Sequence, residues 1–340
     1  MINQQHAHRS TIPPISEDLF RPCWSVMIPT YNCAGYLRET LISVLSQDPG
    51  SDIMQIEVVD DHSTQDDPEA VVKELGQGRV NFYRQPQNVG HVKNFQTCLE
   101  RSQGRLIHLL HGDDRILYGF YAKLQQAFET HPEIGATFCR HIFIDELGHW
   151  QWLSGIEQSD SGILNNWLER IAVEQRIQTP SIVVRRDVYE RLGGFDNRIR
   201  HWGEDWEMWV RIAAQYPVWY EVEPLALYRM RSLSLSGHST KTGENIQDIC
   251  KAIEIIKEYL PQDVMAKLSK TARQNYALFA LTTARKFAAH DDIQSSINQL
   301  RAALQCCSSF NVLRSSLRLS LRIFVRMLKL TLTQTQSGTV

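Results

Sequence analysis

The feature that most constrains the fold is an alternation of short apolar runs with helical patterns along the first part of the chain. The apolar runs are expected to be buried strands at 25–28, 56–59, 80–83, 106–110 and 134–138. Between them, hydrophobic residues recur at helical spacing over 36–47, 71–75, 92–99 and 117–128. Parallel strands require crossover helices of this kind, so the pattern predicts an α/β fold with a mostly parallel sheet flanked by helices.

The composition is that of a globular protein. Hydrophobic residues make up 43% of the 340 positions and charged residues 22%, which is enough apolar material for a sizeable core. The formal net charge of −2 argues against a chain that coats nucleic acid with its whole surface, and no nucleic-acid partner is expected. The seven cysteines are scattered without a Cys-x-x-Cys pair. Neither a disulfide framework nor a thiolate zinc site is therefore expected, and a reducing cytoplasm fits better.

The two ends of the chain differ from this central region. Residues 1–22 form a polar segment without the apolar core of a secretory signal, and no apolar stretch reaches the ~20 residues that span a bilayer. After about residue 245 the pattern is helical throughout. We therefore expect one domain over 23–240 and an all-helical C-terminal region over 241–340, with the boundary in the Ser/Gly-rich stretch 232–243.

Polar clusters follow three of the expected strands. Pro29-Thr-Tyr-Asn32 follows the first strand, Asp60-Asp-His-Ser-Thr64 the second and His111-Gly-Asp-Asp114 the fourth. Each cluster taken alone also suits a helix cap or a turn. Ligands of parallel sheets bind beyond the carboxyl ends of the strands, where all three clusters fall. The adjacent carboxylates of Asp113 and Asp114 need a positive partner, and a divalent cation that carries a diphosphate would supply it.

Six motifs, in this order along the chain, resemble glycosyltransferase family 2, whose members are inverting enzymes. They are Ser25-Val-Met-Ile-Pro-Thr-Tyr-Asn32, Glu57-Val-Val-Asp-Asp-His-Ser-Thr64, Asn88-Val-Gly90, His111-Gly-Asp-Asp114, Gly193-Gly-Phe-Asp196 and Gly203-Glu-Asp205. The resemblance covers about residues 24–236. It implies the GT-A fold, a Rossmann-like sheet that binds nucleotide-diphospho-sugars, and it does not extend into the C-terminal helices.

The resemblance also implies roles for the matching residues. The nucleotide-sugar side comprises Pro29, Thr30, Tyr31, Asp60, Asn88, Gly90 and Asp113. Asp114 would hold a Mg²⁺ or Mn²⁺ ion on the diphosphate. His111 departs from the family pattern because relatives have Asp there, and Arg231 stands where many relatives have His. An arginine cannot ligate a cation but can pair with phosphate oxygens, so Arg231 is also placed on the nucleotide-sugar side.

Asp205 is expected to be the general base that takes the proton of the acceptor hydroxyl. Trp202 and Trp206 offer aromatic faces to the acceptor sugar and would raise the pKa of the carboxyl group by excluding water. Glu204 is placed on the same acceptor side. A structural alternative is that Glu204 and Asp205 favour the first turn of the helix expected over 206–214. For Glu204 this alternative is nearly as good as the functional one.

The segment 293–340 has six basic residues and no acidic one. Arg314, Arg318, Arg322 and Arg326 recur every four positions, so they form one stripe on an otherwise largely apolar helix. Such a helix suits the surface of an anionic membrane. We therefore expect a cytoplasmic protein that is peripheral on the inner face of the cytoplasmic membrane. The alternative is a helix packed on the enzyme or on a second subunit, which leaves a homo-oligomer open.

Together these observations predict a metal-dependent, inverting glycosyltransferase of the hexosyltransferase type. It would move a sugar from a nucleotide-diphospho-sugar, with UDP the first choice, to a hydroxyl of a glycan or lipid-linked acceptor in bacterial surface polysaccharide or glycoconjugate synthesis. The alternative is a non-catalytic nucleotide-sugar-binding or scaffold protein on the same fold. A Rossmann dehydrogenase is excluded because no Gly-x-Gly-x-x-Gly follows the first strand.

Overall fold

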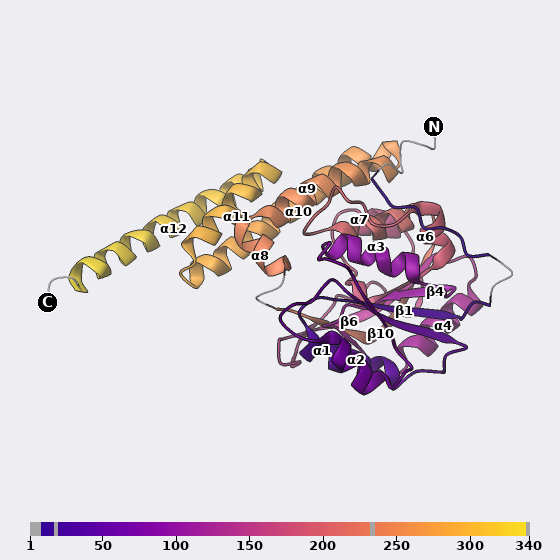
Figure 1. The fold of residues 1–340 in the computed structure, drawn as a ribbon. Helices are drawn as coiled ribbons and strands as arrows, with labels where there is room; N and C mark the ends of the chain where they lie inside the picture. The colour runs from indigo at the N-terminus through magenta and orange to yellow at the C-terminus, as the bar shows by residue number, and fades with distance from the viewer. Residues whose placement is uncertain (1–7, 17–19, 232–234, 338–340) are drawn as a thin grey trace. The chain divides into compact units, whose positions relative to one another are not determined.

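The computed structural model describes residues 8–16, 20–231 and 235–337, with side chains in the last range described for 237–326. The chain divides into two compact units (Figure 1). Unit 1 comprises Met1–Ile171, Gln175–Arg198 and Glu204–Arg231. Unit 2 comprises Ala172–Glu174, Ile199–Gly203 and Ser232–Val340. Unit 2 thus takes two short segments from the middle of the chain, and the expected domain limit at 240/241 stays a prediction.

Unit 1 is built on one ten-stranded sheet in the order β3-β2-β1-β4-β9-β6-β10-β5, with β7 on β6 and β8 on β10. The parallel part consists of β3 (Asn81–Arg84), β2 (Met54–Asp60), β1 (Trp24–Thr30) and β4 (Leu106–Leu109). The strand β9 (Ile182–Arg185) is antiparallel to both β4 and β6 (Ala136–Ile144), and β10 (Val218–Arg229) is parallel to β6. The short strands are β5 (Arg115–Ile116), β7 (Trp150–Leu153) and β8 (Gly162–Ile163).

Helices cover both faces of this sheet. Figure 1 shows α3 (His91–Arg101), α6 (Arg186–Leu192) and α7 (Glu204–Ala213) on one side, with α1 (Ala34–Leu45) and α2 (Pro68–Gly76) on the other. The remaining helices of unit 1 are α4 (Phe120–Thr130) and α5 (Trp167–Ile171). The expected α/β fold with helical flanks is confirmed. The parallel arrangement holds from β3 to β4, whereas the second half of the sheet is mixed because β9 runs against its neighbours.

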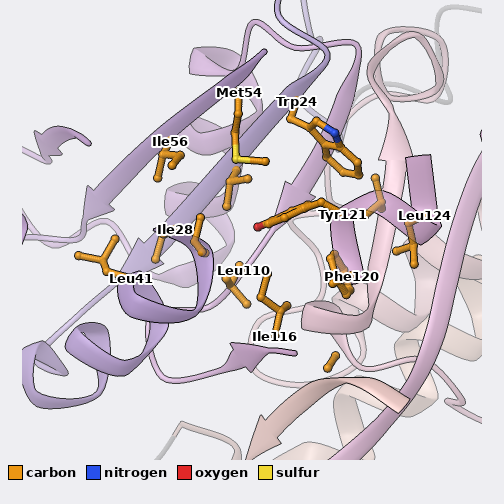
Figure 2. Close-up of a cluster of buried hydrophobic side chains, with 14 of the residues drawn as sticks. Trp24, Ile28, Leu41, Met54, Ile56, Leu110, Ile116, Phe120, Tyr121 and Leu124 are labelled. Carbon is orange, nitrogen blue, oxygen red and sulfur yellow. The ribbon is translucent and has the colours of Figure 1, made fainter. Parts of the chain in front are cut away.

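The main core lies between α1, α4 and the parallel strands (Figure 2). Leu37, Leu41 and Val44 of α1 have no exposed surface, so the helical spacing seen in the sequence marks the face that is buried. Burying each such side chain stabilises the fold by about 1.5–3 kcal/mol. The ring of Trp24 meets that of Tyr121 edge-on at 5.0 Å, which fixes α4 against the start of β1.

Unit 2 is helical, as the sequence predicts. It contains α8 (Leu235–Thr242), α9 (Glu244–Ile256), α10 (Gln262–Ala289), α11 (Ile293–Cys306) and α12 (Phe310–Ser337). Buried alanines along α10, such as Ala277, Ala280 and Ala284, leave room for close approach of its neighbours. Among the described residues, no helix combines the length and the apolar character that crossing a bilayer requires.

Candidate functional site

The parallel strands bring the expected polar clusters to one edge of the sheet. Thr30, at the end of β1, stands in register with Asp60 at the end of β2, and β4 lies on the other side of β1. The backbone N–H of Gly112 donates to the carbonyl of Pro29 at 3.0 Å. A Cβ at Gly112 would come within 2.9 Å of Thr30 Oγ1, so the loop after β4 can approach β1 only with glycine there. Pro29 and Thr30 are buried, whereas Tyr31 is exposed.

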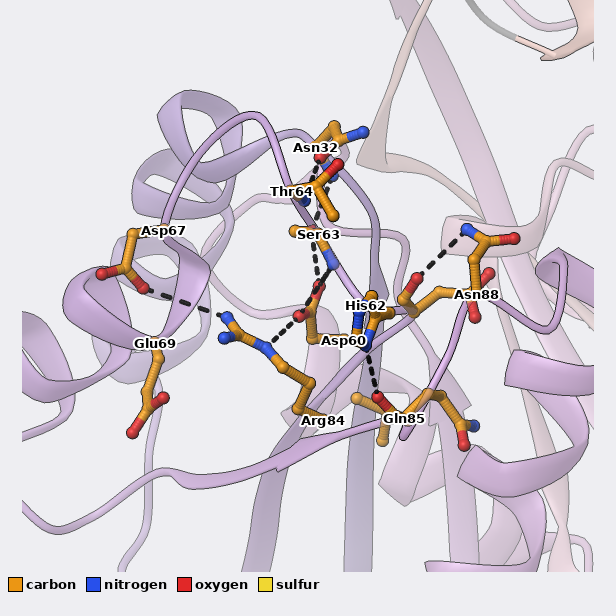
Figure 3. A network of polar contacts seen from close by, with 12 residues as sticks. Asn32, Asp60, His62, Ser63, Thr64, Asp67, Glu69, Arg84, Gln85 and Asn88 are labelled. Atoms are coloured by element: carbon orange, nitrogen blue, oxygen red, sulfur yellow. Dashed lines mark hydrogen bonds and ion pairs between the residues drawn. The ribbon is translucent and has the colours of Figure 1, made fainter.

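Asp60 is completely buried and both of its carboxylate oxygens have donors (Figure 3). The backbone N–H and the hydroxyl of Ser63 donate to the carboxylate, and Arg84 Nε donates to Oδ2 at 2.7 Å. A buried carboxylate needs such partners because losing its water is costly. Asp60 therefore holds the loop after β2 in this structure, and its expected contact with a nucleotide stays a prediction.

The neighbouring Asp61 positions the loop that precedes α3. Its carboxylate accepts hydrogen bonds from the backbone N–H groups of Val89 at 2.7 Å and Gly90 at 3.0 Å. The side chain of Asn88 donates to the Asp61 carbonyl at 3.1 Å. Gly90 has a φ of +85°, which suits glycine. The expected residues Asn88 and Gly90 thus lie beside the end of β2, held by an aspartate to which the sequence analysis gave no role.

His111, Asp113 and Asp114 form a cluster whose ligand atoms all lie within 4.8 Å of one another. Asp114 is buried, and its Oδ1 accepts the backbone N–H of Arg229 at 2.8 Å. Within the described part of the chain, Asp114 Oδ2 and His111 Nε2 are buried without a hydrogen-bond partner. Burial and the charge of Asp113 raise the pKa of Asp114 well above its usual range, and burial lowers the pKa of His111. Carboxylates, an imidazole and two unused polar atoms fit a divalent cation such as Mn²⁺.

Two arginines contact this cluster: Arg229 at the end of β10 and Arg231 two residues later. Arg231 Nε lies 3.0 Å from Asp113 Oδ2, so in this structure the arginine expected to contact phosphate pairs with an acid of the cluster. Arg229 donates through Nε to the Asp113 carbonyl at 2.8 Å and pairs with Glu39 at 2.8 Å. Its guanidinium lies over the ring of Tyr36. The sequence analysis missed Arg229, although its place two residues before Arg231 was a usable signal.

Asp205 lies in the first turn of α7 with three donors around its carboxylate. Gln175 Nε2 donates to Oδ2 at 2.8 Å, Thr179 Oγ1 lies 3.3 Å from the same oxygen, and the backbone N–H of Trp206 donates to Oδ1 at 2.7 Å. Burial, followed by the charge of Glu204, raises the pKa of Asp205 to about 7. This is the direction expected from desolvation. Gln175 and Thr179 carried no signal in the sequence because only the fold brings them to α7.

Glu204 is paired with His91, the first residue of α3. His91 Nε2 and Glu204 Oε1 lie 3.2 Å apart. Burial alone would lower the pKa of His91, but the Glu204 carboxylate more than offsets this and raises it. Burial likewise opposes ionisation of Glu204, yet His91 keeps the pKa of Glu204 below its usual value. The loop held by Asp61 is therefore connected through a charged pair to the residue next to Asp205.

The expected aromatic faces beside Asp205 are the main correction. The side chain of Trp206 is completely buried and its Nε1 donates to the Ile171 carbonyl at 2.6 Å, so it offers no face to a sugar. Its contribution is to exclude water from the start of α7. Trp202 belongs to unit 2, where its ring stacks on Phe279 at 5.7 Å and meets Tyr276 edge-on. Its acceptor-side role stays a prediction.

A parallel strand group with acids at its carboxyl edge, joined to a mixed second half, is the arrangement of a GT-A fold. Two solved structures share it. Staphylococcus aureus TarS in complex with UDP-GlcNAc has a TM-score of 0.62 and 18% identity, over 84% of this chain and 81% of that chain. The Pyrobaculum calidifontis mannosyltransferase PcManGT in complex with GDP-Man and Mn²⁺ has a TM-score of 0.54 and 17% identity, over 91% of this chain and 87% of that chain. At this identity the likeness establishes the fold.

The sequence profile described as "Glycosyl transferase family 2" matches residues 25–193, and the chain belongs to this family. The Mycobacterium tuberculosis protein MT1568 is 28% identical over 246 residues, which are 69% of this chain and 75% of the relative. The Bacillus subtilis minor teichoic acid biosynthesis protein GgaB is 31% identical over 119 residues, 34% of this chain but 13% of GgaB. The resemblance predicted from the six motifs is thereby confirmed.

The raised pKa of Asp205 is directly testable. We expect its carboxyl group to titrate near pH 7, and Glu204→Gln to lower this midpoint because the neighbouring negative charge is removed. The measurement is ¹³C NMR of the aspartate carboxyl signals against pH, with the Asp205 signal assigned from Asp205→Asn. The surface variant Glu100→Gln is the control and should leave the midpoint unchanged. A midpoint near pH 4 in the wild type would contradict the described environment.

Proposed function

We propose that this chain is an inverting, metal-dependent glycosyltransferase. It transfers a sugar from a nucleotide-diphospho-sugar to a hydroxyl of a glycan or lipid-linked acceptor in bacterial surface polysaccharide or glycoconjugate synthesis. The observation that carries the proposal is a short series of contacts that joins the metal cluster to the acids of α7. Phe95 stacks on His111 at 5.0 Å and meets His91 edge-on at 5.5 Å, and His91 lies 3.2 Å from Glu204, next to Asp205. Burial raises the pKa of Tyr228, and the charges of Asp114, Asp113, Asp205 and Glu204 raise it further. The candidate metal ligands and the candidate base thus face one region of unit 1.

The donor assignment draws on the solved structures and on the strand ends. TarS and PcManGT were solved with UDP-GlcNAc and GDP-Man, so nucleotide-diphospho-sugars suit this fold, and UDP is our first choice for the base. Tyr31 is the exposed aromatic residue at the end of β1, where a base can stack. Polysaccharide synthesis as the setting is supported by the name of the relative GgaB.

The chemistry follows from the environment of Asp205. In its ionised form the carboxylate takes the proton of the acceptor hydroxyl while the hydroxyl oxygen bonds to the anomeric carbon. The bond from that carbon to the diphosphate breaks on the opposite face, which inverts the configuration. Gln175 and Thr179 keep the carboxylate oriented, and a pKa of about 7 leaves a useful fraction ionised at neutral pH.

The leaving-group side belongs to the acid cluster. His111, Asp113 and Asp114 are the residues that would hold a Mg²⁺ or Mn²⁺ ion. When bound, the cation neutralises negative charge that develops on the diphosphate. Arg229, at the end of β10, and Arg231, two residues later, contact Asp113, and Arg231 would exchange Asp113 for a phosphate oxygen once a cation offsets the acid.

The metal assignment predicts a linked stabilisation. UDP should raise the Tm far more with Mn²⁺ than with EDTA, because His111, Asp113 and Asp114 would hold the diphosphate only together with a cation, and a ligand stabilises only the state that it binds. Asp114→Asn should abolish the difference, whereas Asp52→Asn, at an exposed site before β2, should retain it. The measurement is a thermal shift series over UDP and Mn²⁺ concentration. An equal shift with EDTA would refute metal dependence.

The base assignment predicts a selective loss of transfer. Asp205→Asn should reduce sugar transfer by about 10²-fold or more, the usual scale for loss of a general base, with UDP binding retained. Glu204→Gln should cost less. The measurement is release of UDP from a UDP-sugar in the presence of acceptor, alongside UDP binding by calorimetry. Transfer by Asp205→Asn close to wild type would show that another group is the base. A wild type that binds donors tightly but transfers none of them would favour the scaffold alternative.

We further propose that α12 attaches the enzyme to the cytoplasmic face of an anionic membrane. Val312, Leu319 and Ile323 are buried within unit 2, so one face of α12 is already packed. A second apolar face stays exposed, formed by Phe310, Leu313, Leu317, Leu321 and Phe324, which are 47–77% exposed. Their spacing of three and four places them on one side of the helix.

The charges of α12 favour an anionic lipid surface over a second protein subunit. Arg314, Arg318 and Arg322 are exposed and each follows a leucine of the exposed apolar face, so the cations flank that face. Arg326 is instead paired with Asp291 at 2.6 Å. An exposed apolar face that is flanked by exposed basic residues, with no acidic residue on the helix, is typical of helices that lie in the interface of anionic membranes.

Vesicle binding tests this attachment. The triple variant Leu313→Ser, Leu317→Ser, Leu321→Ser should lose binding to vesicles of 30% phosphatidylglycerol in phosphatidylcholine while its Tm stays near that of the wild type, because these side chains are exposed. Wild-type binding should weaken as salt rises, since exposed charges are screened. The measurement is co-sedimentation. If the wild type does not bind such vesicles at low salt but the triple variant changes its oligomeric state, α12 is a subunit contact instead.

A further inference from the structure

The edge strand β7 presents two exposed tryptophans. Trp150 is 64% exposed and Trp152 is 53% exposed. The pairing of β7 with β6 is irregular between them, because Trp152 pairs with Phe143 and Trp150 with the next residue, Ile144. Lateral partners share a face of the sheet, so the two tryptophans lie on different faces and Trp152 is the one on the face of Phe143. Large aromatic side chains that are exposed close together often mark a surface that binds a ligand or a partner. Neither tryptophan has a part in the donor side, the metal cluster or the base.

Trp152 is the outer end of a row of three aromatic rings across three strands. It pairs in register with Phe143 of β6, and Phe143 pairs in register with Tyr228 of β10. The rings of Trp152 and Phe143 are stacked at 4.9 Å, and those of Phe143 and Tyr228 meet edge-on at 5.7 Å. We call Trp152, Phe143 and Tyr228 the aromatic row. Because lateral partners in a sheet share a face, the row is continuous on one side of unit 1.

The inner end of the aromatic row lies at the site. Tyr228 directly precedes Arg229, whose backbone N–H donates to Asp114 Oδ1 and whose Nε donates to the Asp113 carbonyl, both at 2.8 Å. The charges of Asp114, Asp113, Asp205 and Glu204 also raise the pKa of Tyr228. The row therefore leads from the exposed edge at β7 to the region where the acceptor hydroxyl must be deprotonated. It also supplies exposed aromatic surface on the acceptor side, which the buried Trp206 does not.

The surroundings of the tryptophans suit a saccharide. No lysine or arginine stands between Asp145 and Ile156. The arginines that reach this hairpin from other elements, Arg115, Arg140 and Arg229, donate to its backbone carbonyls, in contrast to the exposed arginines along α12, so an anionic lipid surface is a poor match. Beside the rings is a polar rim in which Asp145 accepts hydrogen bonds from Gln151 Nε2 at 3.0 Å and from the His149 backbone N–H at 2.9 Å. Sugar rings have apolar C–H faces and polar edges, which match an aromatic face beside hydrogen-bonding groups.

We propose that the aromatic row forms an acceptor subsite that binds the sugar units of a glycan acceptor beyond the unit that receives the new sugar. The proposal rests on the proposed function for the direction in which the glycan lies. Trp152 is held against Phe143, so little side-chain freedom is lost when a sugar ring stacks on it. The acceptor class that follows is an oligosaccharide or polysaccharide chain rather than a single small hydroxyl compound.

Binding of the full chain to an array of immobilised bacterial surface glycans tests the subsite. The wild type should retain a defined set of glycans, and Trp152→Ala should weaken that retention at least tenfold, with partial rescue in Trp152→Phe. Ile53→Ala is the matched control, because Ile53 is also exposed but lies before the start of β2, at the opposite end of that strand from the site. The Tm shift with UDP and Mn²⁺ should be the same in all variants, which shows that unit 1 remains folded.

The outcomes separate this proposal from the proposed function. Retention of no glycan by the wild type, or equal retention by Trp152→Ala, overturns the subsite even if UDP binding and transfer are intact. A second outcome is that the wild type retains glycans but binds no nucleotide, and that Trp152→Ala loses glycan retention. This result supports the subsite and refutes the proposed enzymatic function. Where transfer to a retained glycan is measured, Trp152→Ala should raise the acceptor KM with kcat little changed. Loss of phosphatidylglycerol vesicle binding in Trp152→Ala, without loss of glycan retention, would assign the tryptophans to lipid and overturn the proposal.

Discussion

The architecture of the site depends on the burial of carboxylates at the carboxyl ends of the strands. A buried acid without a partner costs several kcal/mol, so each one dictates its surroundings. Asp60 is satisfied by Ser63 and Arg84, and Asp61 by two backbone N–H groups, so these two acids fix loops. Asp114 differs because one of its oxygens has no hydrogen-bond donor among the described residues. That unmet requirement, next to Asp113, is the reason why Asp114 is the acid proposed to hold the cation.

The same constraint acts on Asp205 with a different result. Its donors are neutral side chains and a backbone N–H, which are weaker partners than an arginine, and the nearest charge is the negative one of Glu204. The pKa therefore rises towards neutrality, whereas the carboxylate of Glu204 is kept ionised by His91. Two adjacent acids thus have opposite protonation tendencies because one has a cationic partner and the other does not. A base poised near neutrality is what proton removal from a sugar hydroxyl requires.

The sequence predicted the features that depend on local periodicity and on motif order. The strands and helices from β1 to α4, the helical C-terminal region and the acids at the strand ends follow from patterns within a few residues. The antiparallel β9 and the partners Arg229, His91 and Gln175 did not, because they depend on which strands become neighbours. Trp206 illustrates the limit: its closeness to Asp205 in sequence suggested an acceptor face. Trp206 and Trp209, three apart on α7, lie instead on the face that is buried in the core.

The order of strands explains why the groups proposed for the donor and for the acceptor lie apart in one sheet. The groups proposed for the donor follow β1, β2 and β4, in the parallel half, whose strand ends all point to one edge. The antiparallel β9 then lies between β4 and β6. The strands of the second half therefore do not all end at the same edge, and this half contains the β6–β7 hairpin and the long β10. At the end of β10, Arg229 and the following Arg231 contact Asp113 of the acid cluster. Tyr228, on the same strand, contacts Phe143. One strand thus connects the groups proposed to hold the leaving diphosphate with the surface proposed for the acceptor. If both proposals hold, a change at β7 alters acceptor selection without disturbing the groups proposed for the donor.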